Sequence, residues 1–441
     1  GEGESLLPQG LVARARLRGV AGWVCEAQHL TAFRVFLVRL LAEGNGIAGL
    51  EINRIAEAAD IPASFETKLI DSYPEEFRVV ARGQAYVRWF RRLREGARPD
   101  LEVVTALKRA FPKARAPFVV AQAMYRASAD GDSLVLGYAQ RFVPAERSAR
   151  DLAREGLQGF LERIALAPEG RTPPPLDGMV PRRLDFHALP EAVQDALGGS
   201  WAEFASLLGK RLAELHLALA RLKDPDFASE PFSLLHLHSL YHSIRSRLRR
   251  GLGHLARRPA SVSDVLRPLA EEAVTRQPEF LESLRRLTFG RMEGRRLRIH
   301  GNLRLDRALF TGKDFVFTGF DGPHWLNPPE RRLRFSPLVD VAAIIRDLHH
   351  VAGAEPLRVG PEPASADWAA YWAELSGGLF LDGYLDVAGR GGFLPANPLE
   401  IEVLLEAFLM DRAVADLRGD PSPPQQESAL RLLLRRGGRG R

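Results

Sequence analysis

Cysteine and long apolar segments are scarce in this 441-residue sequence, and each scarcity excludes a class of protein. Cys25 is the only cysteine, so no internal disulfide can form. No apolar run reaches the length of about 18 residues that a transmembrane helix needs. The opening segment, residues 1–5, is acidic and lacks the basic and then apolar pattern of a secretory signal. We therefore expect a cytoplasmic protein with no membrane partner.

Lysine is also scarce, so the formal net charge of +6 is carried almost entirely by arginine. The arginines are spread along amphipathic segments, often near Glu or Asp, and no basic stripe is interleaved with aromatic residues. This pattern is typical of a solvated arginine-rich surface, whereas nucleic-acid binders gather basic residues on one face. A nucleic-acid or polyphosphate binder is therefore the weakest functional alternative.

The histidines are not spaced for a metal site. His238 and His242 would share a helix face, but no cysteine or carboxylate cluster completes a ligand set. Trp368 and Trp372, also four residues apart, could stack on a sugar, although a buried helix stripe is the better interpretation. We interpret the following histidines as helix-surface or interhelix residues: 216, 236, 238, 242, 349 and 350.

The first third of the sequence has the pattern of a small mixed α and β unit. Residues 33–41 fit either a strand or a short helix, and two short apolar runs around residues 82–84 predict a hairpin. Helical spacing runs from 101 to 111, and a strand from 134 to 143 stops at Pro144. Strands, one helix and a strand that leads into helices predict an α+β fold with a small first lobe.

Helical spacing dominates from residue 145 onward. Two short β-like runs, 297–302 and 315–320, interrupt it, and 168–181 has the composition of a Pro/Gly-rich loop. This pattern predicts a mainly helical second lobe. The expected helices lie at 207–222, 232–255, in two segments between 265 and 287, from 339 onward, at 368–387 and at 398–417.

Residues 298–350 carry the most informative motif. They contain RIHGNLRLDRALFTGKDFVFTGFDG and, further on, ERRLRFSPLVDVAAIIRDLHH. This block resembles the catalytic segment of maltokinases and of the kinase-like region often fused to trehalose synthase. The resemblance spans roughly residues 78–418, whereas the first 75 residues match the family's cap region only loosely. Shorter segments agree with the same family at 87–93, 208–219, 230–232, 239–241 and 408–414.

The resemblance implies a two-lobed, protein-kinase-like fold similar to aminoglycoside phosphotransferases. It also implies a role in maltose, trehalose or α-glucan metabolism. The expected partner is a trehalose synthase catalytic domain, fused or associated, and the expected ligand is maltose or an α-glucan. We divide the chain into a cap region at 1–77, a β-rich N-lobe at 78–144, a helical C-lobe at 145–436 and a frayed tail at 437–441.

Carried over residue by residue, the family's catalytic groups are mostly replaced in this sequence. The base falls on Asn302, whose neutral amide cannot accept the hydroxyl proton of a sugar. One metal ligand falls on Arg307, a cation that repels Mg²⁺, and another on Gly319, which has no side chain. A single carboxylate of the metal set survives, at Asp321.

The positions expected to hold the nucleotide also depart from the family. The triphosphate lysine falls on Arg88, and the helix acid that would pair with it falls on Glu102. Residues 74–77, Pro-Glu-Glu-Phe, replace a polar phosphate-binding turn, and two carboxylates there would repel a triphosphate. The strand expected to bind adenine contributes Gln140, Phe142 and Val143.

Two positions keep the family's supporting residues. His300 opens the catalytic-loop motif as a structural histidine. Asp340 matches the aspartate that braces the loop backbone, although an acid at a helix N-terminus is a physically similar interpretation. We therefore expect a catalytically degenerate, pseudokinase-like module to which no cofactor binds tightly. The alternative is an active maltokinase that uses ATP and Mg²⁺, with relocated ligands, to form maltose 1-phosphate.

Overall fold

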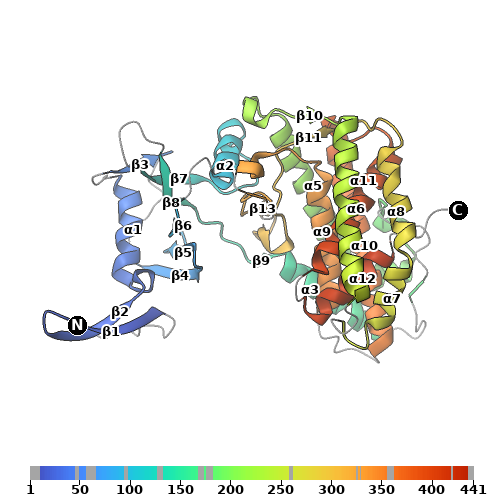
Figure 1. The fold of residues 1–441 in the computed structure, drawn as a ribbon, viewed down its shortest axis with the longest axis horizontal. Helices are drawn as coiled ribbons and strands as arrows, with labels where there is room; N and C mark the ends of the chain where they lie inside the picture. Colours follow the sequence, from blue (N-terminus) through green and yellow to red (C-terminus); the bar gives the residue numbers. More distant parts are fainter. Residues whose placement is uncertain are drawn as a thin grey trace. The chain divides into compact units, whose positions relative to one another are not determined.

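The computed structural model describes most of the chain and divides it into two compact units. One unit comprises residues 1–109 and 116–144, and the other comprises residues 110–115 and 145–441 (Figure 1). The assignment of these units to a cap, an N-lobe and a C-lobe stays a prediction. The described residues are 10–44, 49–55, 66–93, 98–126, 133–166, 173–174, 182–257, 262–323, 326–327, 329–354, 362–418 and 421–435.

A six-stranded antiparallel sheet forms the centre of the first unit, in the order β3-β7-β8-β6-β5-β4. The predicted hairpin is confirmed, because Ala81 pairs with Ala85 around a turn in which Arg82 and Gly83 have positive φ angles of 47° and 65°. The strands are β3 (Leu50–Arg54), β4 (Thr67–Ser72), β5 (Glu76–Ala81), β6 (Ala85–Phe90), β7 (Val119–Tyr125) and β8 (Leu134–Arg141).

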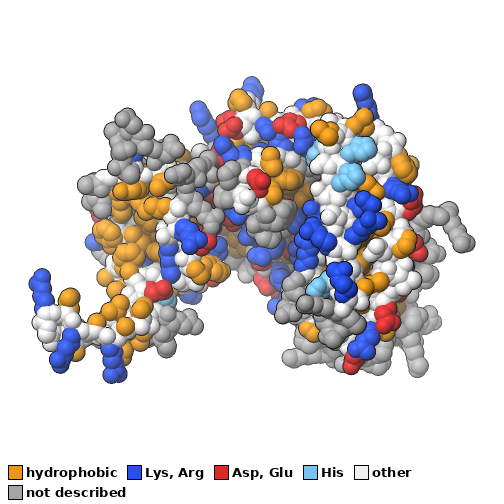
Figure 2. Space-filling model, viewed as in Figure 1, with side chains coloured by type: hydrophobic (Ala, Val, Ile, Leu, Met, Phe, Trp, Pro, Cys, Tyr) orange, Lys and Arg blue, Asp and Glu red, His pale blue; other side chains and the backbone are white. Residues whose placement is uncertain are grey.

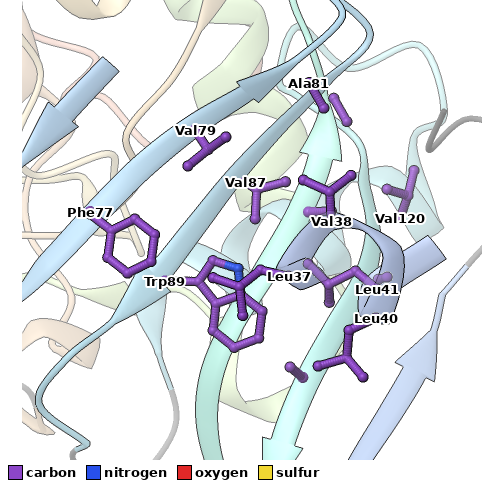
Figure 3. Close-up of a cluster of buried hydrophobic side chains, with 14 residues drawn as sticks. Leu37, Val38, Leu40, Leu41, Phe77, Val79, Ala81, Val87, Trp89 and Val120 are labelled. Carbon is purple, nitrogen blue, oxygen red and sulfur yellow. The ribbon is translucent and has the colours of Figure 1, made fainter. Parts of the chain in front are cut away.

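The segment at 33–41, which fitted a strand or a helix, lies within helix α1 (Thr31–Glu43). Its buried residues, among them Val38 and Leu41, pack against sheet residues such as Val87 and Val120 (Figure 3). A second helix, α2 (Pro99–Ala110), follows β6 along the chain. Strands β3 and β4 belong to the expected cap region but pair within the same sheet as the later strands, so the boundary at residue 77 falls inside β5.

A separate two-stranded hairpin, not anticipated from the sequence, precedes α1. Strands β1 (Leu11–Leu17) and β2 (Val20–Cys25) are joined by Arg18 and Gly19, whose φ angles of 49° and 85° suit a two-residue hairpin turn. At its base the Glu26 amide donates to the Gly10 carbonyl at 2.9 Å. The short helix η2 (Ala27–His29) then leads into α1.

Helices build the second unit, as the sequence predicted. Helix α5 packs along α10, and α9 packs against α10, α11 and α12 (Figure 1). The described helices and helical turns are α3 (Ala149–Leu166), η4 (Phe186–Ala188), α4 (Glu191–Leu197), α5 (Gly199–Ala220), η5 (Pro225–Phe227), α6 (Leu234–Arg257), α7 (Arg267–Thr275), α8 (Gln277–Arg285), η7 (Arg286–Thr288), η8 (Leu305–Arg307), η9 (Pro329–Arg332), α9 (Leu338–Ala354), α10 (Glu362–Ala388), η10 (Gly389–Gly391), α11 (Pro398–Asp416) and α12 (Pro423–Leu434).

Two small sheets accompany these helices. One pairs β10 (Glu230–Pro231) with β11 (Arg295–Arg296), and the other has the order β13-β12-β9, with β9 (Arg147–Ser148), β12 (Ala308–Phe310) and β13 (Phe315–Phe317). The predicted β-like run at 315–320 thus contains β13. In the run at 297–302 only Leu297 pairs, in an isolated bridge with Phe335, because the following residues turn into a loop held by side chains.

Across the described helices, none combines the length and the apolar character that a bilayer crossing requires. The tail at 437–441 and nearly all of the predicted loop at 168–181 lie outside the described residues.

Candidate functional site

A loop at residues 300–307 of the second unit is held by buried carboxylates of helix α9. The amides of His300 and Gly301 donate to the two oxygens of Asp340, each at 2.9 Å. The Leu305 amide donates to Oδ2 of Asp347, two helical turns further along α9, also at 2.9 Å. Both carboxylates are almost completely buried, so they fix the loop backbone rather than face solvent.

Asp340 has a third partner that the sequence did not indicate. His216 of α5 places Nε2 at 3.1 Å from Oδ2 of Asp340 and Nδ1 at 2.9 Å from the Tyr384 hydroxyl of α10. Burial alone would raise the pKa of Asp340, but the hydrogen bond and charge interaction with His216, followed by those of His300 and Gly301, hold that pKa below its usual range. The carboxylate therefore stays ionised inside the helical unit.

His300 is fully buried and neutral. Its Nε2 lies 2.9 Å from the Thr318 carbonyl, to which the neutral ring donates, and its ring packs on Phe320 with centroids 4.6 Å apart. Burial, the largest influence, lowers the pKa of His300 to about 4. His300 thus links the loop at 300–307 to the strand end at 318–320.

Arg307, Gly319 and Asp321 form one cluster beyond this link. The guanidinium of Arg307 donates from Nη1 to the Gly319 carbonyl at 2.6 Å and lies 3.4 Å from Oδ2 of Asp321. Gly319 has a φ of 77°, and a Cβ added there would lie 3.0 Å from Nη1 of Arg307. A side chain at position 319 would therefore compete with this guanidinium for space. Asn302, half-buried, lies in the braced loop.

In the first unit, Arg88 of β6 lies between two carboxylates. Its Nε donates to Glu76 at 2.8 Å and its Nη1 to Asp100 at 2.9 Å, while the Tyr138 hydroxyl donates to Asp100 at 3.1 Å. These side chains are nearly buried. The acids that the structure places on Arg88 are thus one from β5 and one from the first turn of α2. Glu102 lies further along α2, and its pairing with Arg88 stays a prediction.

The segment expected to form the phosphate loop, 74–77, spans the end of the turn between β4 and β5 and the first two residues of β5. The Glu75 carbonyl accepts from the amides of Arg91 and Arg92, so this turn is fixed to the end of β6. Glu76 belongs to β5 and binds Arg78 as well as Arg88.

The three positions expected to contact adenine lie at the end of β8 and just beyond it. Gln140 is in β8, where it pairs with Tyr86 and Val119. The Phe142 amide donates to the Gln84 carbonyl at 2.8 Å, so this donor is already engaged inside the first unit. Val143 follows, half-buried.

Sequence reasoning interpreted His216 only as a helix-surface or interhelix residue and did not connect it to Asp340, and it missed Asp347. Asp347 stands seven residues after Asp340, which places both carboxylates on one face of a helix, and this spacing could have indicated a second brace. His216 lies 124 residues from Asp340, and no spacing signal joins them. The interpretation of Trp368 and Trp372 as core residues is confirmed, because both are buried and Trp372 stacks on Trp201.

An open pocket of about 710 Å³ lies elsewhere in the second unit, around the turn of the β12–β13 hairpin. Its aromatic side chains, Phe186, Phe204 and Phe310, stand beside polar ones that include Lys210 and Lys313. Aromatic faces with a few polar groups are typical of ligand pockets.

No family model matches the sequence, whereas solved structures resemble the fold. A glucosamine kinase in complex with glucosamine, ADP and inorganic phosphate is 17% identical, with a TM-score of 0.63 over 92% of this chain and 82% of that chain. Crystal forms B and A of glucosamine kinase give TM-scores of 0.64 and 0.60 at 16% and 18% identity, over 94% and 96% of this chain and 86% and 84% of those chains. The predicted kinase-like, two-lobed α+β fold is thereby confirmed. At these identities the likeness establishes the fold and no activity.

Proposed function

We propose that this chain is a catalytically degenerate, maltokinase-like module of maltose, trehalose or α-glucan metabolism. Its role would be that of a structural or regulatory partner of a trehalose synthase rather than that of a phosphotransferase. The sugar-kinase-like fold supports the general class, and the resemblance of residues 298–350 supports the finer assignment.

The contact of Arg307 with Asp321 is the observation that best supports the proposed loss of catalysis. Mg²⁺ in a phosphotransferase needs oxygen ligands, and Asp321 is the one carboxylate left in the implied set. A guanidinium that already lies 3.4 Å from this carboxylate neutralises it and repels a second cation. The residues present therefore do not fit Mg²⁺.

The surroundings of Arg88 support the same proposal. The implied site pairs this cation with one helix acid, whose place Asp100 takes, whereas Glu76 is an added carboxylate that contacts both Nε and Nη2 of Arg88. A nucleotide phosphate would have to displace these carboxylates or lie beside them. Like charges placed close together raise the free energy of the bound state.

An active sugar kinase is the second candidate, and the intact loop brace favours it. Asp340 and Asp347 hold the loop that contains Asn302, and a backbone fixed in this way is what an active kinase would need there. The glucosamine kinases of similar fold add glucosamine to maltose as an acceptor to test.

The deciding experiment measures ADP release with ATP and Mg²⁺ in the presence of maltose or glucosamine. We expect no acceptor-dependent rate above that of Asn302→Ala. A clear rate in the unmodified chain that Asn302→Ala abolishes would establish an active kinase. The partner role is checked separately, by sedimentation of the chain mixed with a trehalose synthase: co-sedimentation supports it, and independent boundaries contradict it.

Repair of the site gives a sharper prediction. The variant with Asn302→Asp, Arg307→Gln and Gly319→Asp returns the base and a second carboxylate and removes the repelling cation. Asp tolerates a positive φ better than most residues, and shortening Arg307 frees the space that a side chain at 319 needs. Because these groups act as a unit, we expect each single change to be nearly silent and the triple change to increase Mg²⁺-dependent ATP binding.

Isothermal titration of the unmodified chain, the three single variants and the triple variant checks this expectation. The matched control is Arg304→Gln, which changes an exposed arginine of the same loop. If Arg307→Gln alone gave tight Mg²⁺-dependent ATP binding, the positive charge at 307 would be the sole cause of weak binding, and the expectation that the three groups act as a unit would be wrong.

A further inference from the structure

The pocket at the turn of the β12–β13 hairpin is separate from the loop at 300–307. It lies wholly within the second unit, and none of the residues 300–307 lines it. One wall is a face of α5, whose lining residues follow mostly at steps of three and four, the spacing of one side of a helix. Those that keep this spacing are Gly199, Ala202, Glu203, Ser206, Leu207 and Lys210.

A second wall is the segment before α4, which is fixed to α10. The Leu184 amide donates to the Gly378 carbonyl at 3.3 Å. A Cβ on Gly378 would lie 2.7 Å from the Cβ of Leu184, so a glycine lets this segment pack directly on the helix. Arg183 also donates to Asp382 of α10 at 2.8 Å. The protein itself therefore holds this wall in place.

The β12–β13 turn forms the third wall and is anchored to α5. Asp314, just after the turn, accepts from Nε of Arg211 on α5 at 2.6 Å and pairs with Arg115 at 2.5 Å. The Phe310 ring of β12 packs edge-on against Phe204 of α5, with centroids 5.0 Å apart. Contacts within the chain thus fix all three walls, and the pocket is preformed, as ligand sites usually are.

Aromatic rings and charges of both signs meet at this pocket. Phe186 and Phe204 are only half-buried, so part of each ring stays accessible. Arg183, bound to Asp382, brings the cations to the same number as the carboxylates, so the charges balance. The charged side chains that line the pocket are Asp185, Glu203, Asp382, Lys210 and Lys313.

We propose that this pocket binds a neutral oligosaccharide. A carboxylate only accepts hydrogen bonds and an ammonium only donates them, whereas every sugar hydroxyl does both. Glu203 and Lys210 stand seven residues apart on one face of α5, or about 10 Å along the helix axis. A ligand that reaches both is longer than one hexose ring. The rings of Phe186 and Phe204 offer flat apolar surfaces to the C–H faces of the sugars.

The charge balance favours a neutral ligand over an anionic or an apolar one. A phosphate group would lie near three carboxylates, and like charges placed together raise the free energy of the bound state. Anions find a better complement on α6, which contains no acidic residue and along which Figure 2 shows arginine and histidine side chains gathered. A purely apolar ligand would remove the charged groups from water without replacing their hydrogen bonds.

The test begins with isothermal titration of the full chain with maltotriose and with its β-linked counterpart, cellotriose. Only the choice of an α-linked glucose oligomer as first probe rests on the proposed function, so sugar binding and ADP release can fail independently. We expect saturable binding of at least one trisaccharide at millimolar concentration, because an open site recovers little beyond the cost of association. Glucose 6-phosphate should bind no more tightly than glucose.

Two substitutions assign this binding to the pocket. Phe204→Leu keeps an apolar side chain against Phe310 but removes the aromatic face, and should weaken binding about fivefold. Glu203→Gln removes a charged acceptor at an exposed position and should weaken it about fivefold as well. The matched controls are Phe289→Leu, an aromatic residue that is 73% exposed, and Glu271→Gln, an exposed acid of α7. Neither control lines the pocket, so both should bind as the unmodified chain does.

Hydrogen exchange locates the bound sugar without any substitution. Added trisaccharide should slow the exchange of amides in the segment 182–188 and in the turn 311–314. Slower exchange in the loop 300–307 alone would place the sugar beside Asn302 instead. Circular dichroism checks that each variant is folded, and if Phe204→Leu is not, Glu203→Gln and the exchange pattern still decide.

Several results would overturn the proposal. These are the absence of saturable binding with either trisaccharide, an affinity that both pocket substitutions leave unchanged, and slower exchange confined to 300–307. Tighter binding of glucose 6-phosphate than of glucose would assign the pocket to phosphorylated ligands and reject a neutral one.

Discussion

Asp340 illustrates how one buried residue organises the candidate site. Its carboxylate accepts from two successive loop amides and from His216, so three donors from two distant segments offset the cost of burying its charge. His300 next to it is buried as a neutral ring, because burial disfavours the imidazolium more strongly than the nearby Asp340 carboxylate favours it. At the residue scale, the ionised carboxylate of Asp340 and the neutral ring of His300 thus each keep one protonation state near neutral pH.

The buried, neutral His300 predicts a stability loss in mild acid. Its folded pKa of about 4 lies below the ordinary value of 6.5, so the unfolded chain takes up the proton first as pH falls. The contribution is complete above pH 6.5 and declines as pH falls toward 4. Between pH 7 and pH 5 we expect a loss of roughly 2 kcal/mol from this group.

Urea unfolding at pH 7 and pH 5 measures this loss. His300→Gln keeps a donor for the Thr318 carbonyl but does not titrate, so its free energy of unfolding should fall less over the same interval. His236, whose pKa is also lowered to about 4 by burial and then by Arg296, adds a second contribution that this variant retains. Parallel pH dependence in both proteins would rule out His300 as a source.

Helices α5 and α10 each place a glycine at the contact between them, Gly209 on α5 and Gly383 on α10. A Cβ on Gly209 would overlap the Phe380 carbonyl and lie 2.7 Å from the Tyr384 amide nitrogen, and one on Gly383 would overlap the backbone of Ser206. The two backbones therefore approach more closely than side chains would allow. This approach brings His216 of α5 within reach of Tyr384 on α10, and so connects helix packing to the brace at Asp340.

Gly209→Ala is expected to destabilise the chain by about 3 kcal/mol, because an added methyl group has only backbone atoms to displace. Gly199→Ala, in the first turn of the same helix, meets no atom within 4 Å and should be neutral or stabilising by up to about 1 kcal/mol. Denaturant unfolding of the two variants beside the unmodified chain checks the contrast. Equal stabilities would show that the helices can separate at little cost.

At the scale of the whole molecule, the cluster around Arg307 and the carboxylates on Arg88 predict a weak response to nucleotide. A ligand that binds only the folded chain raises its free energy of unfolding by RT ln(1 + [L]/Kd), or about 2.7 kcal/mol at a hundredfold excess over Kd. We expect ATP with Mg²⁺ at millimolar concentration to leave the unfolding temperature nearly unchanged. The chain carrying the triple repair should gain a Mg²⁺-dependent shift, and a large shift in the unmodified chain would contradict the prediction.

Local pattern alone predicted much of the architecture. The hairpin at 82–84, the helices of the second unit and the change to short strands near 315 follow from spacing within a few residues, which a local signal can carry. The resemblance of the block at 298–350 predicted the kinase-like fold. Strand β7 and the β1–β2 ribbon were not anticipated, because the first sits between turns with little alternation and the second is too small and basic to look like a packed element.

What the sequence by itself determined is the inventory: an α+β chain, the loop that contains Asn302, a cation at 307 and no side chain at 319. Tertiary structure alone decided the partners. In the folded chain Arg307 lies beside Asp321, and Arg88 lies between Glu76 and Asp100. His216 contacts Asp340, which is 124 residues further along the chain. Hydrogen bonds and ion pairs depend on distances of a few ångströms between segments remote along the chain, and only packing of the helices and the sheet sets those distances.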